Sequence, residues 1–519
     1  MPKVQTSESD LDRKIDLATA LQYGTAEGYP PLLSFVRQFT REVVHATVPY
    51  LGGPEVILTC GSTDGMAKTL DLLTDPWSEP RGDDVRLRQG LLCEVFMYSN
   101  VLTQSLPRGL NVAPVEIDGE GMVAYGDGGL EHVLANWDET KGRRPHLMYT
   151  VTMGHNPTGV VLSLKRRKEL YSICSKYDVI IVEDDPYWYL QYPSAALGEA
   201  QSRGLLVPRQ ATEAPTKSSG YDFIDSLTPS YLSMDTEGRV IRLDTFSKTI
   251  APGCRMGWIT AQPDLIERLL RISETSTQNP SGFVQSMVAQ LTIGHQPEAH
   301  RSFFALKSPQ ARMAFTGWSA DGWVRWLSGL RGSYERRMHR MCTILDAHSF
   351  QLKQSRAVHP SSPLAGYAVV EKTRLLSFAW PRGGMFVWLR VHFENHPCWQ
   401  VEGPSMGIID GPKLSMAMMV YLTRKPNLVL AAPGLMFSAN DGIRAEKGWG
   451  YYRLCFAAES EENVDRCSER FGVGVERFFG IKDPEAIEEL AKELGISEER
   501  REELVAEGDV GNLATWMGC

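Results

Sequence analysis

Short apolar runs alternate with helical patterns along the first half of the chain. Four of these runs predict buried strands: Val56–Leu58, His146–Val151, Val179–Val182 and Val240–Leu243. Between them, apolar side chains recur at helical spacing, as at Met66, Leu70 and Leu73 or at Leu170, Ile173, Cys174 and Tyr177. This alternation predicts an α/β fold with a mostly parallel sheet and helices on both of its faces.

The length of the chain and the breaks in this pattern predict a large domain with a smaller partner domain. A chain of 519 residues exceeds what a single small core accommodates. We predict a short N-terminal arm (1–29), a large domain (30–275), a smaller α+β domain (276–480) and an acidic helical tail (481–519). Segments 194–230, 353–375 and 395–411 are typical of surface insertions. Asp483-Pro484 predicts the start of a helix. A solvated surface is the expected setting of the tail, and partner binding is the alternative.

Charge and cysteine usage narrow the class of protein. The formal net charge of -9 argues against a nucleic-acid-binding protein. No apolar stretch at the N-terminus suggests a secretory signal, and no apolar run has the length of about 18 residues that a membrane span needs. The nine cysteines form no CxxC pair, which favours reduced thiols over disulfides or a metal site. We therefore expect a cytoplasmic protein without a metal.

The strongest chemical signal is Thr245-Phe246-Ser247-Lys248, followed by Arg255. A lysine amine that condenses with an aldehyde needs a fixed, partly dry position. Hydroxyl groups and a guanidinium are suitable ligands for a phosphate beside it. A surface lysine is the plain alternative for Lys248, but the clustered hydroxyls and arginine favour a covalently bound, phosphorylated cofactor.

Three further motifs lie where predicted strands end. They are Asn156-Pro157-Thr158-Gly159, Glu183-Asp184-Asp185-Pro186-Tyr187, and the turn Thr59–Gly65 with Ser62 and Thr63. Ligands of open α/β sheets bind at this edge, and a helix start is an anion cradle. Taken singly, each motif has an ordinary structural explanation, namely an Asn-Pro turn, a solvated acidic loop and a serine N-cap.

Together these segments resemble the fold-type I pyridoxal phosphate (PLP) aminotransferases. The most similar group contains kynurenine/α-aminoadipate aminotransferase and the fungal aromatic amino acid aminotransferases. The resemblance runs from Leu21 to about Cys467 and includes LQYGTAEGYPPL, YTVTMGHNPTG, VIIVEDDPYWYLQY, GRVIRLDTFSKTIAPGCRMGWIT, GGMFVWL and YYRLCFAAES. The tryptophan-rich segment 317–338 is similar to the fungal branch in particular.

The resemblance implies a role for each residue that matches these motifs. Lys248 is expected to join the cofactor aldehyde as a Schiff base and then to carry the proton between the substrate Cα and the cofactor. Asp184 would pair with the pyridine nitrogen, where a carboxylate keeps the ring protonated. Asn156 and Tyr187 would hydrogen-bond the ring hydroxyl, and Tyr98 would stack on the ring. Five side chains would hold the phosphate: Ser62, Thr63, Thr245, Ser247 and Arg255.

Two further roles concern the substrate and the partner subunit. Arg453, with Asn156 beside it, would bind the substrate α-carboxylate as a planar fork. Tyr23 would reach the phosphate of the neighbouring subunit's cofactor in a homodimer. A structural arginine is the alternative for Arg453, and a core tyrosine is the alternative for Tyr23 and for Tyr98.

The resemblance implies transfer of an amino group from an L-amino acid, with an aromatic donor expected, to a 2-oxo acid such as 2-oxoglutarate. The cycle would be ping-pong through pyridoxamine phosphate. A PLP-dependent β-lyase and a non-catalytic binding protein of the same fold are the alternatives. The chain departs from the family at Thr63 and Thr245, where glutamine and serine are usual. The 20 residues before Leu21 are also fewer than in the usual N-terminal arm, which lines the substrate pocket.

Overall fold

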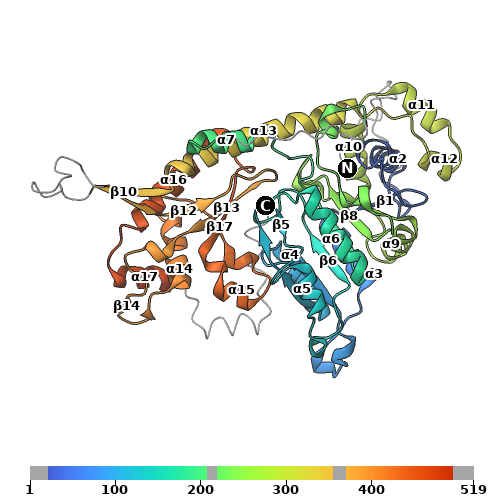
Figure 1. Ribbon diagram of the computed structural model, residues 1–519. Coiled ribbons are helices and arrows are strands. Elements are labelled where there is room, and N and C mark those ends of the chain that lie inside the picture. Colours follow the sequence, from blue (N-terminus) through green and yellow to red (C-terminus); the bar gives the residue numbers. More distant parts are fainter. Residues whose placement is uncertain (1–20, 207–218, 355–369, 495–519) are drawn as a thin grey trace, which may run out of the picture.

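The computed structural model describes residues 21–206, 219–354 and 370–494, and a seven-stranded sheet forms its larger part (Figure 1). The strand order is β1-β9-β8-β7-β6-β2-β3. Strand β9 runs antiparallel to both of its neighbours, and the remaining pairs are parallel. The strands are β1 (Glu55–Thr59), β2 (Gly90–Glu94), β3 (Asn111–Val115), β6 (Leu147–Thr150), β7 (Ile180–Asp184), β8 (Val240–Thr245) and β9 (Gly257–Ala261). The predicted α/β architecture is therefore confirmed.

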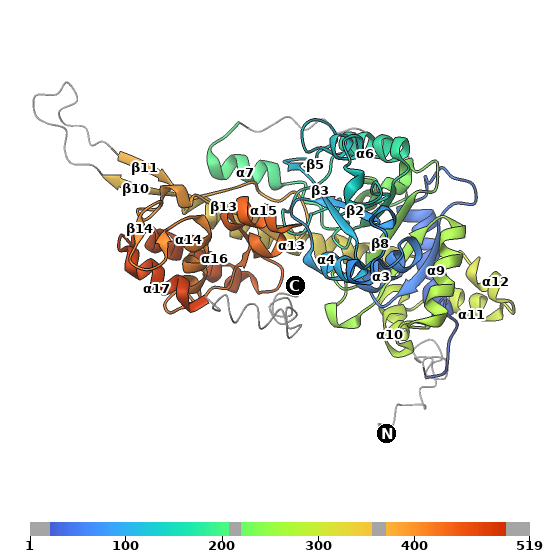
Figure 2. The same cartoon turned by 90° about the horizontal axis from the view of Figure 1, so that it is seen from below.

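Helices cover both faces of this sheet, because strands buried on both sides need apolar partners on each. Figure 2 shows α6 on one side of the strands and α3, α4 and α9 on the other. Val182 packs in the core with α3 and α9, whereas its neighbour Ile181 packs in the core with α6. The helices that follow or flank the strands are α2 (Pro30–Gln38), α3 (Ser62–Leu73), α4 (Ser99–Ser105), α5 (Leu130–Ala135), α6 (Leu164–Tyr177), α9 (Pro263–Thr275), α10 (Gly282–Ile293), α11 (Pro297–Ala305) and α12 (Pro309–Met313).

A second, four-stranded sheet lies beside the first and has the order β12-β13-β17-β16. All of its neighbouring strands are antiparallel. Its strands are β12 (Leu376–Phe378), β13 (Phe386–Val391), β16 (Ala432–Pro433) and β17 (Tyr451–Cys455). The accompanying helices are α14 (Gly411–Thr423), α15 (Asp441–Glu446), α16 (Glu461–Phe478) and α17 (Pro484–Leu494).

The long helix α13 (Asp321–Ala347) runs along both parts of the molecule (Figure 1). Near its start, Trp323 packs in a core with Phe246 and Trp258 of the larger sheet region. Near its end, Met338 and Leu345 pack in the core that contains β13 and β17. The domain boundaries at 29, 275 and 480 stay predictions.

Two predicted surface segments contain more regular structure than expected, and the first of them is also partly buried. Segment 194–230 contains α7 (Ala195–Arg203) and α8 (Asp222–Asp225), and Ala195 and Ala200 are buried. Segment 353–375 includes one strand of the hairpin β10 (Phe350–Gln354) and β11 (Val370–Arg374). Residues 207–218 and 355–369 lie outside the described part.

The tail begins as predicted, with the backbone N–H of Glu485 donating to Asp483 Oδ1 at the start of α17 (3.0 Å). As in an amphipathic surface helix, Glu485, Glu489 and Lys492 are exposed on one face of α17, and Ile487, Leu490 and Ala491 are buried on the other. Glu488 also accepts hydrogen bonds from Ser405 and from the backbone of Met406. The rest of the tail, 495–519, lies outside the described residues.

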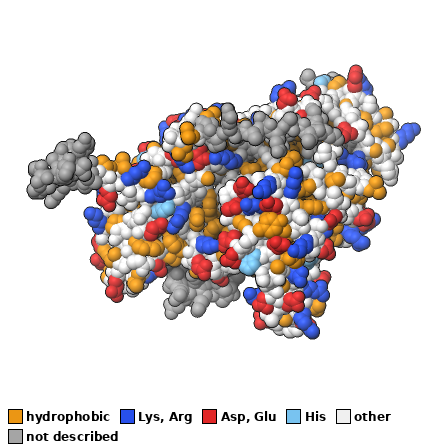
Figure 3. Space-filling model, in the orientation of Figure 1, with side chains coloured by type: hydrophobic (Ala, Val, Ile, Leu, Met, Phe, Trp, Pro, Cys, Tyr) orange, Lys and Arg blue, Asp and Glu red, His pale blue; other side chains and the backbone are white. Residues whose placement is uncertain are grey.

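The surface in Figure 3 carries acidic and basic side chains side by side. No helix among the described residues is long and apolar enough to span a membrane. All eight cysteines in the described ranges are free thiols, and Cys93, Cys174, Cys342 and Cys398 are buried. The described residues contain no cluster of His, Cys, Asp and Glu side chains that could hold a metal ion.

Candidate active site

The predicted site residues gather at one edge of the larger sheet. Strands β2, β6, β7 and β8 are parallel neighbours, so their carboxyl ends meet at this edge. Tyr98 follows β2, Asn156 follows β6, Asp184 ends β7 and Lys248 follows β8. In open α/β sheets this edge is where ligands bind.

Lys248 is half-buried in a turn directly after β8. The turn is closed around the carbonyl of Phe246, which accepts hydrogen bonds from the backbone N–H groups of Thr249 (3.2 Å) and Ile250 (2.8 Å). The Phe246 ring itself is 1% exposed. Because the Phe246 ring is buried two residues before Lys248, the backbone from which the lysine side chain extends is held in place.

Hydroxyl groups and one guanidinium lie beside this turn. Thr245 Oγ1 lies 2.9 Å from Ser247 Oγ, and Arg255 Nη1 donates to Ser247 Oγ at 3.3 Å. Gly61 precedes the start of α3 with a φ of 93°, and a Cβ there would come within 2.9 Å of Arg255 Nη2. The structure thus brings Thr245, Ser247 and Arg255 to the start of α3, which begins with Ser62 and Thr63.

The Asp184 carboxylate is 6% exposed and only partly satisfied. Tyr149 Oη donates to Asp184 Oδ2 at 2.8 Å, while the buried Oδ1 has no hydrogen-bond partner among the described residues. The pKa of Asp184 is raised to about 7, mainly by burial and also by the charges of Asp185 and Asp244, while the Tyr149 hydrogen bond opposes the shift. A cationic N–H group that donates to Oδ1 would give this oxygen a hydrogen bond and would compensate the negative charge of the Asp184 carboxylate.

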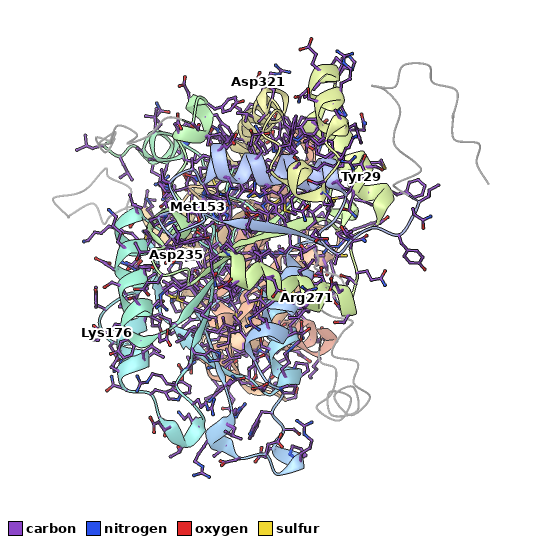
Figure 4. All side chains as sticks on the ribbon, turned by 90° about the vertical axis from the view of Figure 1, so that its right-hand side faces the viewer. Tyr29, Met153, Lys176, Asp235, Arg271 and Asp321 are labelled. Carbon is purple, nitrogen blue, oxygen red and sulfur yellow. The ribbon has the colours of Figure 1, made fainter. Side chains whose placement is uncertain are left out.

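Asp185 has a different environment, although it is the adjacent carboxylate. Its Oδ1 accepts from the backbone N–H groups of Thr152 (2.8 Å) and Met153 (3.1 Å), and its Oδ2 lies 3.1 Å from Arg242 Nη1. Met153 lies in the interior (Figure 4). Arg242 also pairs with Asp244 (3.0 Å) and Glu183 (3.1 Å). The carboxylate of Asp185 is therefore fully used in a buried network of hydrogen bonds and ion pairs that joins β6, β7 and β8.

Arg453 lies on β17 of the smaller sheet and contacts a residue at this edge of the larger sheet. Its Nη1 donates to Asn156 Oδ1 at 2.7 Å. Its guanidinium lies between two aromatic rings, with Cζ 4.2 Å from the centroid of Phe386 and 4.7 Å from that of Phe437. At 7% exposed, Arg453 is a buried cation directly beside a predicted cofactor ligand.

The two predicted ring-contacting tyrosines lie in the same region. Burial raises the pKa of Tyr98, the charge of Asp184 raises it further, and Arg255 and Arg453 oppose the shift. Burial likewise raises the pKa of Tyr187, which the charge of Arg453 opposes. Both phenols therefore lie within electrostatic reach of Asp184 and Arg453, which places the predicted cofactor and substrate ligands around one centre.

Tyr23 is the exception among the predicted residues. Its side chain is 89% exposed in this single chain, so it is not the core tyrosine that was the alternative. Its predicted role at a neighbouring subunit stays a prediction.

Several residues around the site were missed by the sequence analysis. Tyr149 was treated only as part of a buried strand, yet it is the hydrogen-bond donor to Asp184. Arg242 and Asp244 were also missed. Two charged residues at alternate positions of a buried strand are a recognisable signal for a buried ion pair, and this signal could have identified them.

The residues present fit pyridoxal phosphate. The unsatisfied Oδ1 of Asp184 suits a protonated pyridine nitrogen, and the space that a Cβ at Gly61 would fill lies against Arg255, as a phosphate cradle requires. Lys248 and Arg453 supply an amine for the aldehyde and a guanidinium for a carboxylate. The fold and this set of side chains define a fold-type I PLP-dependent enzyme.

Comparisons with known proteins agree with this class. The family model for aminotransferase class I and II matches residues 129–314. An aromatic amino acid aminotransferase of Schizosaccharomyces pombe is 34% identical over 488 residues, which cover 92% of this chain and 82% of that protein. An L-tyrosine:2-oxoglutarate aminotransferase of Tapinella panuoides is 33% identical over 436 residues, covering 83% of this chain and 67% of that protein.

A solved structure shows the same architecture. Aminotransferase Aro8 from Candida albicans has a TM-score of 0.66 and 29% sequence identity, and the match covers 92% of this chain and 83% of that one. The chain belongs to the class I and II aminotransferase family, whose members are PLP-dependent enzymes.

Proposed function

We propose that this enzyme transfers the amino group of an aromatic L-amino acid to a 2-oxo acid such as 2-oxoglutarate. The observation that carries the proposal is the position of Arg453, a buried guanidinium between Phe386 and Phe437 at the edge that holds Lys248. A guanidinium binds a carboxylate in a fixed plane, and the two buried rings hold it in place. The fungal relatives are named for tyrosine and aromatic amino acids, which supports the same donor class.

The roles of the side chains follow from their positions. Lys248 would hold the cofactor covalently and afterwards move the proton from the substrate Cα. Asp184 would keep a proton on the pyridine nitrogen, and Ser247 and Arg255 would bind the phosphate. When bound, PLP supplies the electron sink for cleavage of the Cα–H bond. Arg453 would orient the substrate so that this bond faces Lys248.

Phenylalanine, tyrosine, tryptophan or kynurenine should exceed aspartate as amino donor by at least about tenfold in kcat/KM. The reason is that the motifs assign one arginine, Arg453, to one substrate carboxylate, so the second carboxylate of aspartate would be desolvated without a matching cation, and the fungal relatives are named for aromatic donors. Steady-state rates with 2-oxoglutarate as acceptor, with glutamate and ammonia quantified, test this. A preference for aspartate would contradict the donor class, and ammonia in place of glutamate would indicate the β-lyase alternative.

We also propose a cytoplasmic homodimer with shared active sites. Free thiols support a reducing compartment. The predicted role of Tyr23 supports a second subunit at this surface, and its ring, 89% exposed, makes no commitment to the core of its own chain.

Mixing two impaired variants should restore activity if Tyr23 serves the neighbouring subunit. Lys248→Ala removes the site of its own chain, and Tyr23→Ala would weaken the site across the interface. In each mixed dimer one site carries both changes and the other carries neither. Random exchange makes about half of the dimers mixed, so activity should recover to about a quarter of wild type.

The measurement requires that Tyr23→Ala alone is impaired and that subunit exchange is shown by native mass spectrometry. The unmixed variants, treated identically, are the controls. Activity that stays at the level of the separate variants would show that Tyr23 acts within its own chain.

A further inference from the structure

The tryptophan-rich segment contacts the turn that carries Lys248. The indole Nε1–H of Trp326 donates to the backbone carbonyl of Thr249 at 2.7 Å. Thr249 is adjacent to Lys248 and is 3% exposed. The carbonyl of Thr249 therefore has a fixed donor from a different part of the fold, 77 residues further along the chain.

A second tryptophan of the same helix contacts the other side of this turn. Trp323 lies three residues before Trp326 on α13, so the two side chains share one helix face. The centroid of the Trp323 ring lies 6.0 Å from that of Phe246, whose other neighbour is Trp258 at 4.9 Å. Helix α13 thus holds the chain two residues before Lys248 by packing and one residue after it by a hydrogen bond.

Trp326 differs from Trp323 in its exposure as well as in its hydrogen bond. Its side chain is 52% exposed, whereas Trp323 is 3% exposed. Any large apolar side chain at this position would bury a similar area, so burial does not by itself require a tryptophan. The indole N–H is the group that distinguishes it from other large apolar side chains.

We propose that Trp326 is a positioning residue for Lys248. By holding the Thr249 carbonyl, Trp326 limits rotation of the turn and keeps the amine aimed at the edge where Asp184 and Arg453 lie. This inference rests on the proposed function of Lys248. Proton transfer depends on geometry, and displacement of a catalytic group lowers the rate more than it lowers substrate affinity.

The test is Trp326→Phe, which keeps a large ring on the half-exposed surface and removes the donor. Trp137→Phe is the matched control, because Trp137 Nε1 donates to the carbonyl of Gly142 at 2.9 Å far from this site. Both holoenzymes are compared with wild type for kcat, for KM of the amino donor and for the pH at which the visible band of the lysine-bound cofactor titrates.

We expect Trp326→Phe to lower kcat by about tenfold, with KM changed by less than about twofold, and to shift the titration midpoint of the visible band. Trp137→Phe should match wild type in all three. Equal behaviour of the two variants would overturn the proposal. Borohydride labelling of Lys248 in wild type separates this outcome from failure of the proposed function, in which Lys248 would not be labelled at all.

Discussion

Replacing Lys248 with alanine is expected to lower turnover by at least about a thousandfold. The substitution removes both the amine that holds the cofactor and the group that moves the proton, so no second side chain compensates. Steady-state transamination by the purified variant measures the effect. Because Ser247, Arg255 and Asp184 remain, the variant should still bind PLP, which equilibrium dialysis or fluorescence titration would show.

Lys165→Ala is the matched control, because this lysine side chain is 85% exposed and lies on the surface helix α6. It should retain the wild-type rate. A Lys248→Ala enzyme that turns over within about tenfold of wild type would contradict the assignment.

Asp184→Asn is expected to lower kcat by about a hundredfold or more, since a neutral amide does not stabilise a proton on the pyridine nitrogen. Asp185→Asn should keep most of its rate per folded molecule. Its main effect should be a lower melting temperature, because the carboxylate of Asp185 holds Thr152 and Met153 and pairs with the buried Arg242. Comparable losses of kcat in the two variants would contradict the choice of Asp184.

Although Asp184→Asn should lower kcat, it should raise the free energy of unfolding of the apoprotein. The folded-state pKa of about 7 lies above the usual 3.8, so the folded state binds the proton more tightly than the unfolded state does. Asp184 therefore costs stability as the pH rises from about 4 to about 7, by up to about 4 kcal/mol. Urea unfolding of the apoprotein at about pH 8 should show Asp184→Asn to be more stable than wild type, and the gain should shrink toward about pH 5.

The sequence was informative where local pattern and motif coincide. The buried strands that end near Asn156, Asp184 and Lys248 are recognisable from their apolar runs, and parallel pairing then brings their ends together without further information. The same reasoning underlies the prediction of a site at this edge. Segment 194–230, by contrast, has the composition of a loop, but packing against α13 makes part of it helical.

Local sequence patterns could not predict the contacts between residues that are distant in the sequence. Arg453 reaches Asn156 across 297 positions, and Trp326 reaches Thr249 across 77. These pairs exist because the smaller sheet and α13 dock on the larger sheet, which no local periodicity encodes. The chemical difference between Asp184 and Asp185 is of the same kind, since it depends on Arg242 and Tyr149 from neighbouring strands.

Reduction of the holoenzyme with borohydride tests most directly whether Lys248 carries the cofactor. Borohydride adds hydride to the carbon of a carbon–nitrogen double bond and leaves a stable secondary amine, so the cofactor stays attached through proteolysis. Peptide mapping by mass spectrometry should then find the phosphopyridoxyl group on the peptide containing Thr245–Lys248, and on Lys248 within it. A label on any other lysine, or no label on a protein that has bound PLP, would contradict the account.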